Sequence, residues 1–578
     1  MARRPCIARF RGAQSRCNVA KSFVIGTFTL CLLSGASEAL GTGYQQLPLR
    51  PSGDQPKLPD FVPSGVPPGL VLPPVPKVQQ LAETPQGKRY LLRRVQLDGK
   101  TSLPESMIRE LVKPLEGRMV SLEEIENLRQ ALTRAYIERG YINSGAVIPK
   151  NGYRDGVLRI RMEEGRLARV RVHGNERLRA GYISHRLLPE PAEPLHLPSL
   201  QERFQMLLSD PLIRRMNGRI LPGITPGSAI LDVDVVRDRP YQLTLFGDNY
   251  RPPSIGAEAF GTSIWVRNLT GLGDLLDFTF TTSDGSDRFT GGFRLPIGDL
   301  GTEAYVRFDE GDASVVEEPV DNLDIRSQVH TLEGAVTHPF INSLRQRLNL
   351  GVSFNVRENE TELGGRPFSF VQGEPSGRNQ ATVLRIFQDF QRRWDADVVS
   401  FRSTFSVGLN ALGATPRSNP DYPSSEFFAW LGQAQYAHRF TDDGLQVLFR
   451  GMVQLSDAPL LPLEQVAVGG VGTVRGYREN ELVRDQGYAL SGELHIPVLQ
   501  GTEEPYRLVL VPFLDYGAAW NLGQASKSLT SIGIGFNADY RTLHGELYYG
   551  YALDRTPTSD ADDLQDQGIH FQGRIDAF

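Results

Sequence analysis

The amino-acid sequence predicts two α+β units followed by an all-β transmembrane barrel of 16 antiparallel strands. Three observations lead to this prediction. The chain begins with a segment typical of export, and helical periodicity occurs twice between residues 89 and 237. Beyond Asp238 the helical periodicity vanishes, and local stretches alternate between apolar and polar residues. After residue 39 no segment approaches 18 consecutive apolar residues, so no helical membrane span is expected. A secreted chain with 58 Gly is instead typical of a barrel whose strands alternate between lipid and lumen.

Residues 1–39 are predicted to be a secretory signal peptide. Six basic residues precede an apolar run over 23–33, and small residues predict cleavage after Ala39. The run is shorter than the roughly 20 residues that a spanning helix needs. The three cysteines all lie in this segment: Cys6, Cys17 and Cys31. The mature chain is therefore expected to have no disulfide, cysteine nucleophile or thiolate metal site.

Removal of the signal leaves 56 Lys+Arg against 66 Asp+Glu, a net charge of −10. This acidic balance argues against nucleic acid as a partner. The next segment, residues 40–88, contains ten prolines between positions 48 and 76. Because proline lacks a backbone N–H and has a fixed φ, we expect an extended linker rather than a long helix.

Residues 89–164 are predicted to form the first α+β unit, in the order β-α-α-β-β. Alternation predicts strands at Tyr90–Leu97 and Val157–Met162, and apolar residues spaced by three and four predict a helix over Ser121–Arg139. Ser121 followed by Glu124 is a capping box, which sets the helix start, and Gly140 ends the helix.

Residues 165–237 are predicted to repeat the same order as a second unit. A strand is expected at Leu167–Val172, then helices near Arg177–Leu188 and Ser199–Leu208. Two further strands are expected near Leu212–Leu221 and Ser228–Arg237. The repeat indicates two domains of one kind ahead of the barrel.

Residues 238–578 are predicted to form the barrel. A family resemblance carried by the loop motifs guides its division into sixteen strands, which are expected to begin near residues 241, 259, 274, 289, 302, 327, 347, 380, 399, 427, 444, 486, 507, 530, 543 and 568. The long connections all have odd numbers, as expected if one side carries long external loops and the other short periplasmic turns. The connection 455–485 is then the sixth external loop. In the third strand Leu276 and Phe278 alternate with Asp277 and Thr279, so one face suits lipid and the other water.

The sixth loop contains the candidate functional site. Residues 469–473 read Gly-Gly-Val-Gly-Thr and lead into Val-Arg-Gly-Tyr at 474–477, which places Arg475 in a loop that glycine allows to fold back tightly. In a lumen, the Arg475 guanidinium needs a carboxylate. A flexible hairpin tip is the plainer alternative. A nucleotide-binding loop is not expected, because no helix follows.

The candidate partner of Arg475 is Asp515, in the stretch 513–517 (Phe-Leu-Asp-Tyr-Gly) on a later strand. Phe513 begins that stretch, and Glu493 on the intervening strand is a further neighbour. We expect Arg475 and Asp515 to pair, with Gly476 and Tyr477 shaping the loop tip, and the family resemblance that these motifs carry implies that the pair is the conduction and gating site. The alternative for Asp515 is an ordinary lumen-facing carboxylate.

These motifs resemble those of the two-partner secretion transporters (TpsB), the ShlB/FhaC-like haemolysin and adhesin secretion-activation proteins of the BamA-type superfamily. That family carries V-R-G-[YF] in its sixth loop and F-x-D-x-G in a later strand. The two α+β units resemble POTRA (polypeptide-transport-associated) domains, in the phrase 136–141 (Tyr-Ile-Glu-Arg-Gly-Tyr) above all. The second ends in a stretch that looks like the P-G-x-x-P-G signature of TpsB: Pro222, Gly223, Pro226, Gly227 and Ser228.

The resemblance implies an outer-membrane transporter with its POTRA domains in the periplasm, no cofactor and no ATP. Its implied main partner is a secreted TpsA-type exoprotein, whose unfolded N-terminal secretion domain the POTRA domains capture. Lipid and lipopolysaccharide, and periplasmic chaperones and the barrel-assembly machinery during biogenesis, are further implied partners. Family members often begin with a plug helix; here the prolines leave a short plug near residues 41–49 or none.

The alternatives are a BamA/TamA-like insertase, a passive porin and an outer-membrane hydrolase. An insertase usually has more POTRA domains, and a porin needs none. An enzyme is not expected, because no G-x-S-x-G, H-E-x-x-H or Walker motif is present.

Overall fold

The computed structural model describes residues 58–61, 69–71, 89–189, 193–225, 227–298, 300–501, 506–556 and 563–577. The predicted signal peptide and the predicted plug near residues 41–49 lie outside these ranges, as does Pro226. Of the helices within them, none is both long enough and apolar enough to cross a membrane.

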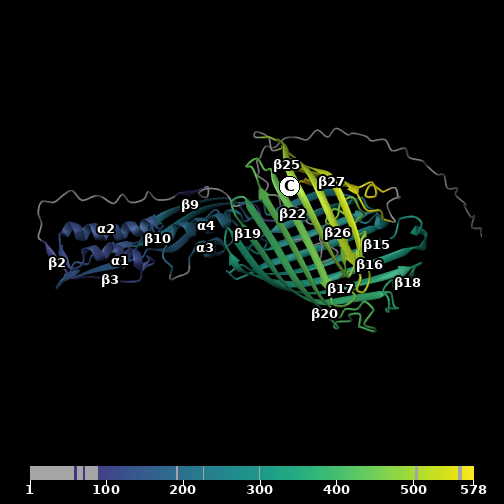
Figure 1. The fold of residues 1–578 in the computed structure, drawn as a ribbon, viewed down its shortest axis with the longest axis horizontal. Helices are drawn as coiled ribbons and strands as arrows, with labels where there is room; N and C mark the ends of the chain where they lie inside the picture. Colours follow the sequence, from purple (N-terminus) through teal and green to yellow (C-terminus); the bar gives the residue numbers. More distant parts are fainter. Residues whose placement is uncertain are drawn as a thin grey trace, which may run out of the picture. The chain divides into compact units, whose positions relative to one another are not determined.

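The first α+β unit has its two helices and its flanking strands in the predicted order, with an additional three-residue strand, β4, between the helices (Figure 1). Its long helix starts after Ser121 as predicted, because the Glu124 N–H donates to Ser121 Oγ at 3.1 Å and the Ser121 N–H donates to the Glu124 carboxylate at 2.7 Å. Strand β3 pairs with β7 in parallel and β5 pairs with β7 antiparallel. Both helices contribute to one apolar core with this sheet. The elements are β2 (Tyr90–Leu92), β3 (Arg94–Asp98), α1 (Glu105–Val112), β4 (Arg118–Val120), α2 (Leu122–Glu138), β5 (Gly145–Val147), β6 (Tyr153–Arg154) and β7 (Val157–Glu163).

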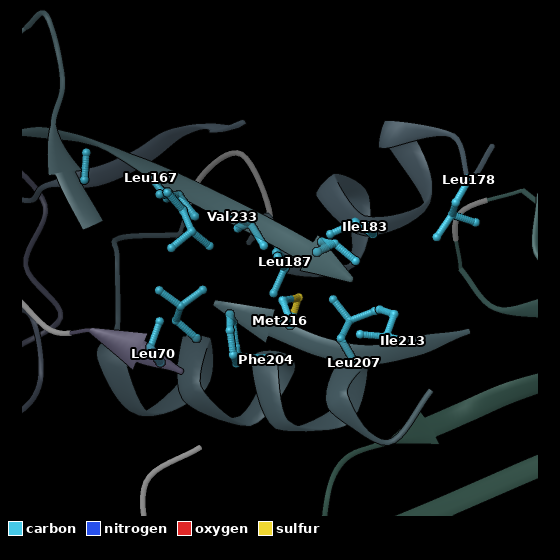
Figure 2. Packing of buried hydrophobic residues seen from close by; sticks show 14 of the residues in the cluster. Leu70, Leu167, Leu178, Ile183, Leu187, Phe204, Leu207, Ile213, Met216 and Val233 are labelled. Carbon is cyan, nitrogen blue, oxygen red and sulfur yellow. The ribbon is translucent and has the colours of Figure 1, made fainter. Parts of the chain in front are cut away.

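The second unit repeats this arrangement. Figure 2 shows Phe204 and Leu207 of one helix in the same core as Met216 and Val233 of the sheet. Leu70 joins that core because its short strand, β1 (Leu70–Val71), pairs in parallel with β9. The unit's elements are β8 (Arg166–His173), α3 (Ala180–Leu187), α4 (Leu197–Leu208), β9 (Ile213–Pro222) and β10 (Ser228–Arg237).

A closed antiparallel barrel follows, as predicted, with 16 spanning strands and one two-residue piece, β18 (Arg366–Pro367) (Figure 1). The first and last strands pair from Thr244 opposite Asp576 to Asp248 opposite Gln572, which closes the sheet. The strands are β11 (Tyr241–Asp248), β12 (Ala259–Arg267), β13 (Leu275–Ser283), β14 (Ser286–Ile297), β15 (Thr302–Ser314), β16 (Ile325–Asn342), β17 (Gln346–Leu363), β19 (Arg378–Arg393), β20 (Asp397–Leu409), β21 (Phe428–Arg439), β22 (Gln446–Ser456), β25 (Gln486–Gln500), β26 (Tyr506–Trp520), β27 (Lys527–Tyr540), β28 (Leu543–Ala552) and β29 (Ile569–Asp576).

The two faces of the wall follow the predicted alternation. Leu276 and Phe278 are exposed on the outside, whereas Thr281, on the other face of the same strand, is buried. The connections also alternate: those at 364–377, 410–427 and 457–485 are long, and those between them are short. The interior of the barrel therefore receives polar side chains from every strand, and the long loops lie at one end.

Candidate functional site

Loop six, residues 457–485, folds into a hairpin that packs against the inner wall of the barrel. Its two short strands, β23 (Val466–Val468) and β24 (Leu482–Arg484), pair antiparallel. Gly469 and Gly470 directly follow β23, with φ of +118° and +91°, a conformation that favours glycine and lets the chain turn sharply. Apolar side chains on both sides then form one cluster: Val466, Val468, Val474, Tyr477 and Leu482 from the loop, with Met452, Ala489, Ala519 and Leu529 from the wall.

The tip of this hairpin carries Arg475 to Asp515. Leu514 and Tyr516 are exposed on the outer face of β26, so Asp515 between them faces the lumen. Arg475 Nε donates to one carboxylate oxygen of Asp515 at 2.8 Å and Nη2 donates to the other at 2.8 Å. The Arg475 backbone N–H adds a third bond to Asp515 at 3.1 Å. The predicted pair is thus present as a bidentate contact between two buried side chains.

Glu493 completes the charge balance of this cluster. Its carboxylate lies 2.7 Å from Arg475 Nη1 and also contacts Arg450, and His495 Nε2 lies 2.8 Å from it. Glu493 is 4% exposed. Arg475 Nη2 also donates to Ser491 Oγ at 3.0 Å. The two carboxylates are therefore shared between two arginines, one of which belongs to the loop and the other to the wall.

Phe513, the other residue predicted near Asp515, covers the guanidinium. The central carbon of Arg475 lies 3.7 Å from the Phe513 ring centroid and 5.0 Å from that of Tyr548. This distance is within the range of a cation–π contact, which is stronger where water is excluded. The aromatic rings thus hold the plane of the guanidinium in place for its bidentate contact.

Gly476 allows the tip to touch the backbone of β28. Its φ is +90°, and a Cβ at this position would lie 2.8 Å from the carbonyl oxygen of Gly550. Any side chain here would push the tip off the wall. The Gly476 N–H donates to Nε2 of the fully buried His570 at 3.2 Å, which links the tip to the last strand of the barrel.

The next two residues extend the contact to other loops. Tyr477 is buried, and its hydroxyl donates to the Thr530 carbonyl at 2.8 Å and accepts from the Asp554 N–H at 3.0 Å. Arg478 pairs with Asp566 at 2.5 Å and with Glu317 at 2.7 Å, in the connections before β29 and after β15. Loop six is therefore bonded to two other connections as well as to the wall.

The predicted signature at residues 222–228 lies in the second α+β unit, in the hairpin between β9 and β10. Gly223 N–H donates to the Ser228 carbonyl at 2.9 Å, and Ser228 Oγ donates to Thr225 O at 2.6 Å. The Gly227 carbonyl accepts from Arg166 N–H and from Asn143 Nδ2, each at 2.9 Å. These residues shape a turn and fasten it to the first unit, so they do not belong to the lumen cluster.

Sequence reasoning did not find Arg450, Ser491, His570, Arg478 or Asp566. Ser491 stands opposite Asp515 in the β25–β26 register, so a known register would have indicated it. No local signal indicates the others. Within the described ranges, no three His, Cys, Asp or Glu side chains gather as a metal site requires.

The arrangement defines a class of protein. Two α+β units of one kind precede a closed barrel, and a long loop is anchored ionically inside the lumen. This is the architecture of an outer-membrane transporter whose periplasmic POTRA domains precede its barrel.

Comparison with known proteins agrees with this class. The family described as haemolysin secretion/activation protein ShlB/FhaC/HecB matches residues 227–538, and the ShlB-type POTRA domain matches residues 90–165. The outer membrane transporter CdiB of Dickeya dadantii is 24% identical over 497 residues, which are 81% of this chain and 84% of that protein. The heme/hemopexin transporter protein HuxB of Haemophilus influenzae is 21% identical over 455 residues, 75% of this chain and 77% of that protein.

A solved structure of CdiB from Escherichia coli shares the fold, with a TM-score of 0.68 and 20% identity over 87% of this chain and 93% of that one. The chain belongs to the ShlB/FhaC/HecB family of haemolysin secretion/activation proteins, the TpsB transporters of two-partner secretion. It is an outer-membrane protein, and its POTRA domains lie in the periplasm.

Proposed function

We propose that this protein captures an unfolded exoprotein through its POTRA domains and passes it through the barrel without ATP. The observation that carries the proposal is loop six, which occupies the lumen and is fastened there by the Arg475–Asp515 contact rather than by covalent structure. An ionic plug of this kind can be withdrawn and restored. The glycine-rich tip leads to β24 and not to a helix, so it is not built as a phosphate-binding loop.

Capture is proposed to occur by strand addition to a POTRA sheet. In the second unit the sheet order is β1-β9-β10-β8, which leaves the eight-residue strand β8 at an edge. An extended chain can add to such an edge through main-chain hydrogen bonds, which tolerate many sequences. Arg169 and Arg171 of β8 are exposed, so this edge favours acidic or polar segments.

The proposed division covers the whole chain, including the signal peptide that is removed from the mature protein. Residues 1–39 are the signal, 89–164 and 165–237 the two POTRA domains, and 238–578 the barrel. Residues 40–88 are the linker, which contributes the short strand β1 to the second POTRA sheet. The exposed apolar band of the barrel meets outer-membrane lipid and lipopolysaccharide. Chaperones and the barrel-assembly machinery act during biogenesis, and no enzymatic activity is proposed.

An insertase of the BamA kind is the second candidate. A structure of BamA from Haemophilus ducreyi lacking POTRA domains 1–3 matches with a TM-score of 0.50 and 13% identity over 84% of this chain and all of that one, which reflects the shared fold alone. The two β-α-α-β-β units and the family match favour export. Co-expression with a TpsA-type exoprotein separates the two functions. Export predicts the partner in the medium only when the transporter is present, whereas an insertase predicts the same defect in many outer-membrane proteins when it is absent.

The barrel itself gives a simple prediction. Outer-membrane fractions should contain the protein, and it should migrate faster in gel electrophoresis unheated than boiled, because a closed barrel satisfies its backbone groups internally and resists detergent. Western blotting of heated and unheated samples measures this. Recovery in the soluble periplasm would contradict the localisation.

A further inference from the structure

The root of loop six, residues 457–465, contains a second buried cluster of charged side chains, separate from the cluster around Arg475. Glu464 Oε2 lies 2.5 Å from Nη2 of Arg385 on β19, and Glu464 Oε1 lies 3.6 Å from Nη1 of Arg357 on β17. Arg357 Nη1 also donates to the Leu463 carbonyl at 2.9 Å. All three charged residues are at most 6% exposed. The loop supplies the carboxylate here, whereas at the tip it supplies the arginine.

This root cluster lies away from the tip around the barrel. Strands β20, β21 and β22 separate β19 from β25, which carries Glu493. The two clusters share no residue. Apolar contacts reinforce the root, where Leu460 and Leu461 pack with Val371 of the connection after β18 and Phe427 of the connection before β21. The backbone of Leu460 also bridges to Ser424 in parallel.

The charges at the root are unequal, because two arginines face one carboxylate. Two other carboxylates that act on Arg357 are already paired, since Arg307 lies 3.5 Å from Glu333 and Arg288 pairs with Asp309 at 2.5 Å. The negative charge of Glu464 therefore offsets the repulsion between Arg357 and Arg385 as well as attracting each of them. Removal of its charge leaves Arg357 and Arg385 unscreened in a buried site, whereas removal of either arginine leaves a balanced pair.

We propose that Glu464, Arg357 and Arg385 form a second ionic anchor, which holds the root of loop six on β17 and β19 independently of Arg475. The proposal rests on the export function: opening the lumen then requires two separate releases. Loss of the tip contact alone swings the segment 466–484 about a root that stays in place. The lumen clears fully only when both anchors are released.

Thiol labelling tests the independence of the two anchors without any partner. In a chain whose three cysteines are replaced by serine, Leu461→Cys reports on the root and Val474→Cys reports on the tip, because both positions are at most 1% exposed. Glu464→Gln should raise the rate of maleimide labelling at 461 at least about tenfold and leave 474 protected. Arg475→Ala should do the reverse.

Two further variants sharpen the test. Arg385→Gln should increase labelling at position 461 less than Glu464→Gln does. Glu464→Asp keeps the negative charge, so position 461 should stay protected in that variant. Arg484→Gln is the matched control, since this loop arginine forms no ion pair with any residue that the structure describes. Protection of 461 in Glu464→Gln, or equal exposure of both reporters in Arg475→Ala, would overturn the proposal. Labelling tests the second anchor, whereas secretion of the exoprotein tests the export function. The failure of one proposal can therefore be told apart from the failure of the other.

Discussion

Arg475→Ala is expected to reduce secretion of the exoprotein sharply while the barrel still assembles. The substitution leaves Asp515 buried without its cation, and breaking one side of a buried pair costs about 3–5 kcal/mol. That loss falls on the docking of the loop tip, because the hydrogen bonds of the barrel strands do not involve Arg475. The measurement is the amount of secreted partner per unit of outer-membrane transporter.

Asp515→Ala should produce the same defect, and the double variant should be little worse than either single one. Residues that act through one contact are not additive, since the second substitution finds nothing left to break. Arg484→Ala, in the same loop, is the control and should secrete normally. Independent, additive losses would show that Arg475 and Asp515 do not act as a pair.

Deletion of residues 89–237 should leave a barrel that inserts in the outer membrane and exports nothing. The two α+β units have apolar cores of their own, and the barrel closes with its own strands. Removal of the units therefore leaves the barrel sheet complete. Capture in the periplasm should be lost with them. Secreted partner and the heat-modifiable fraction of the transporter are the two quantities to measure.

Separate deletions of 89–164 and 165–237 refine this result. Each leaves one intact sheet, so a residual signal in one of them would locate the main capture site. Secretion by the full deletion at the level of the intact protein would place substrate recognition elsewhere in the chain.

Most of the barrel was predictable because its signal is local. Each strand start lies within three residues of its predicted position, because the family resemblance supplied the number of strands and local alternation and turn residues placed each start. The helix after Ser121 was predictable for the same reason, as both halves of its capping box lie within four residues. The Arg475–Asp515 pair was predictable only because both sit in recognisable motifs.

The remaining contacts of the site were not predictable, because they join distant segments without a local pattern. Arg478 and Asp566 are 88 residues apart, and Gly476 and His570 are 94 apart. The sequence around Glu464 has no feature that distinguishes it from an ordinary loop carboxylate. Only the closed barrel brings it to Arg385. Sequence alternation shows that a residue faces the lumen, but not which lumen residue from another strand it meets.

At the loop-six tip, Arg475, Gly476 and Tyr477 contact residues that come later in the chain than the tip itself. Asp515 lies on β26, Thr530 on β27, Gly550 on β28 and His570 on β29. None of these contacts exists until the strand that provides it has joined the sheet. Docking of the tip is therefore complete only after the final strand has joined the sheet. A docked loop six thus indicates that all strands of the barrel are in place.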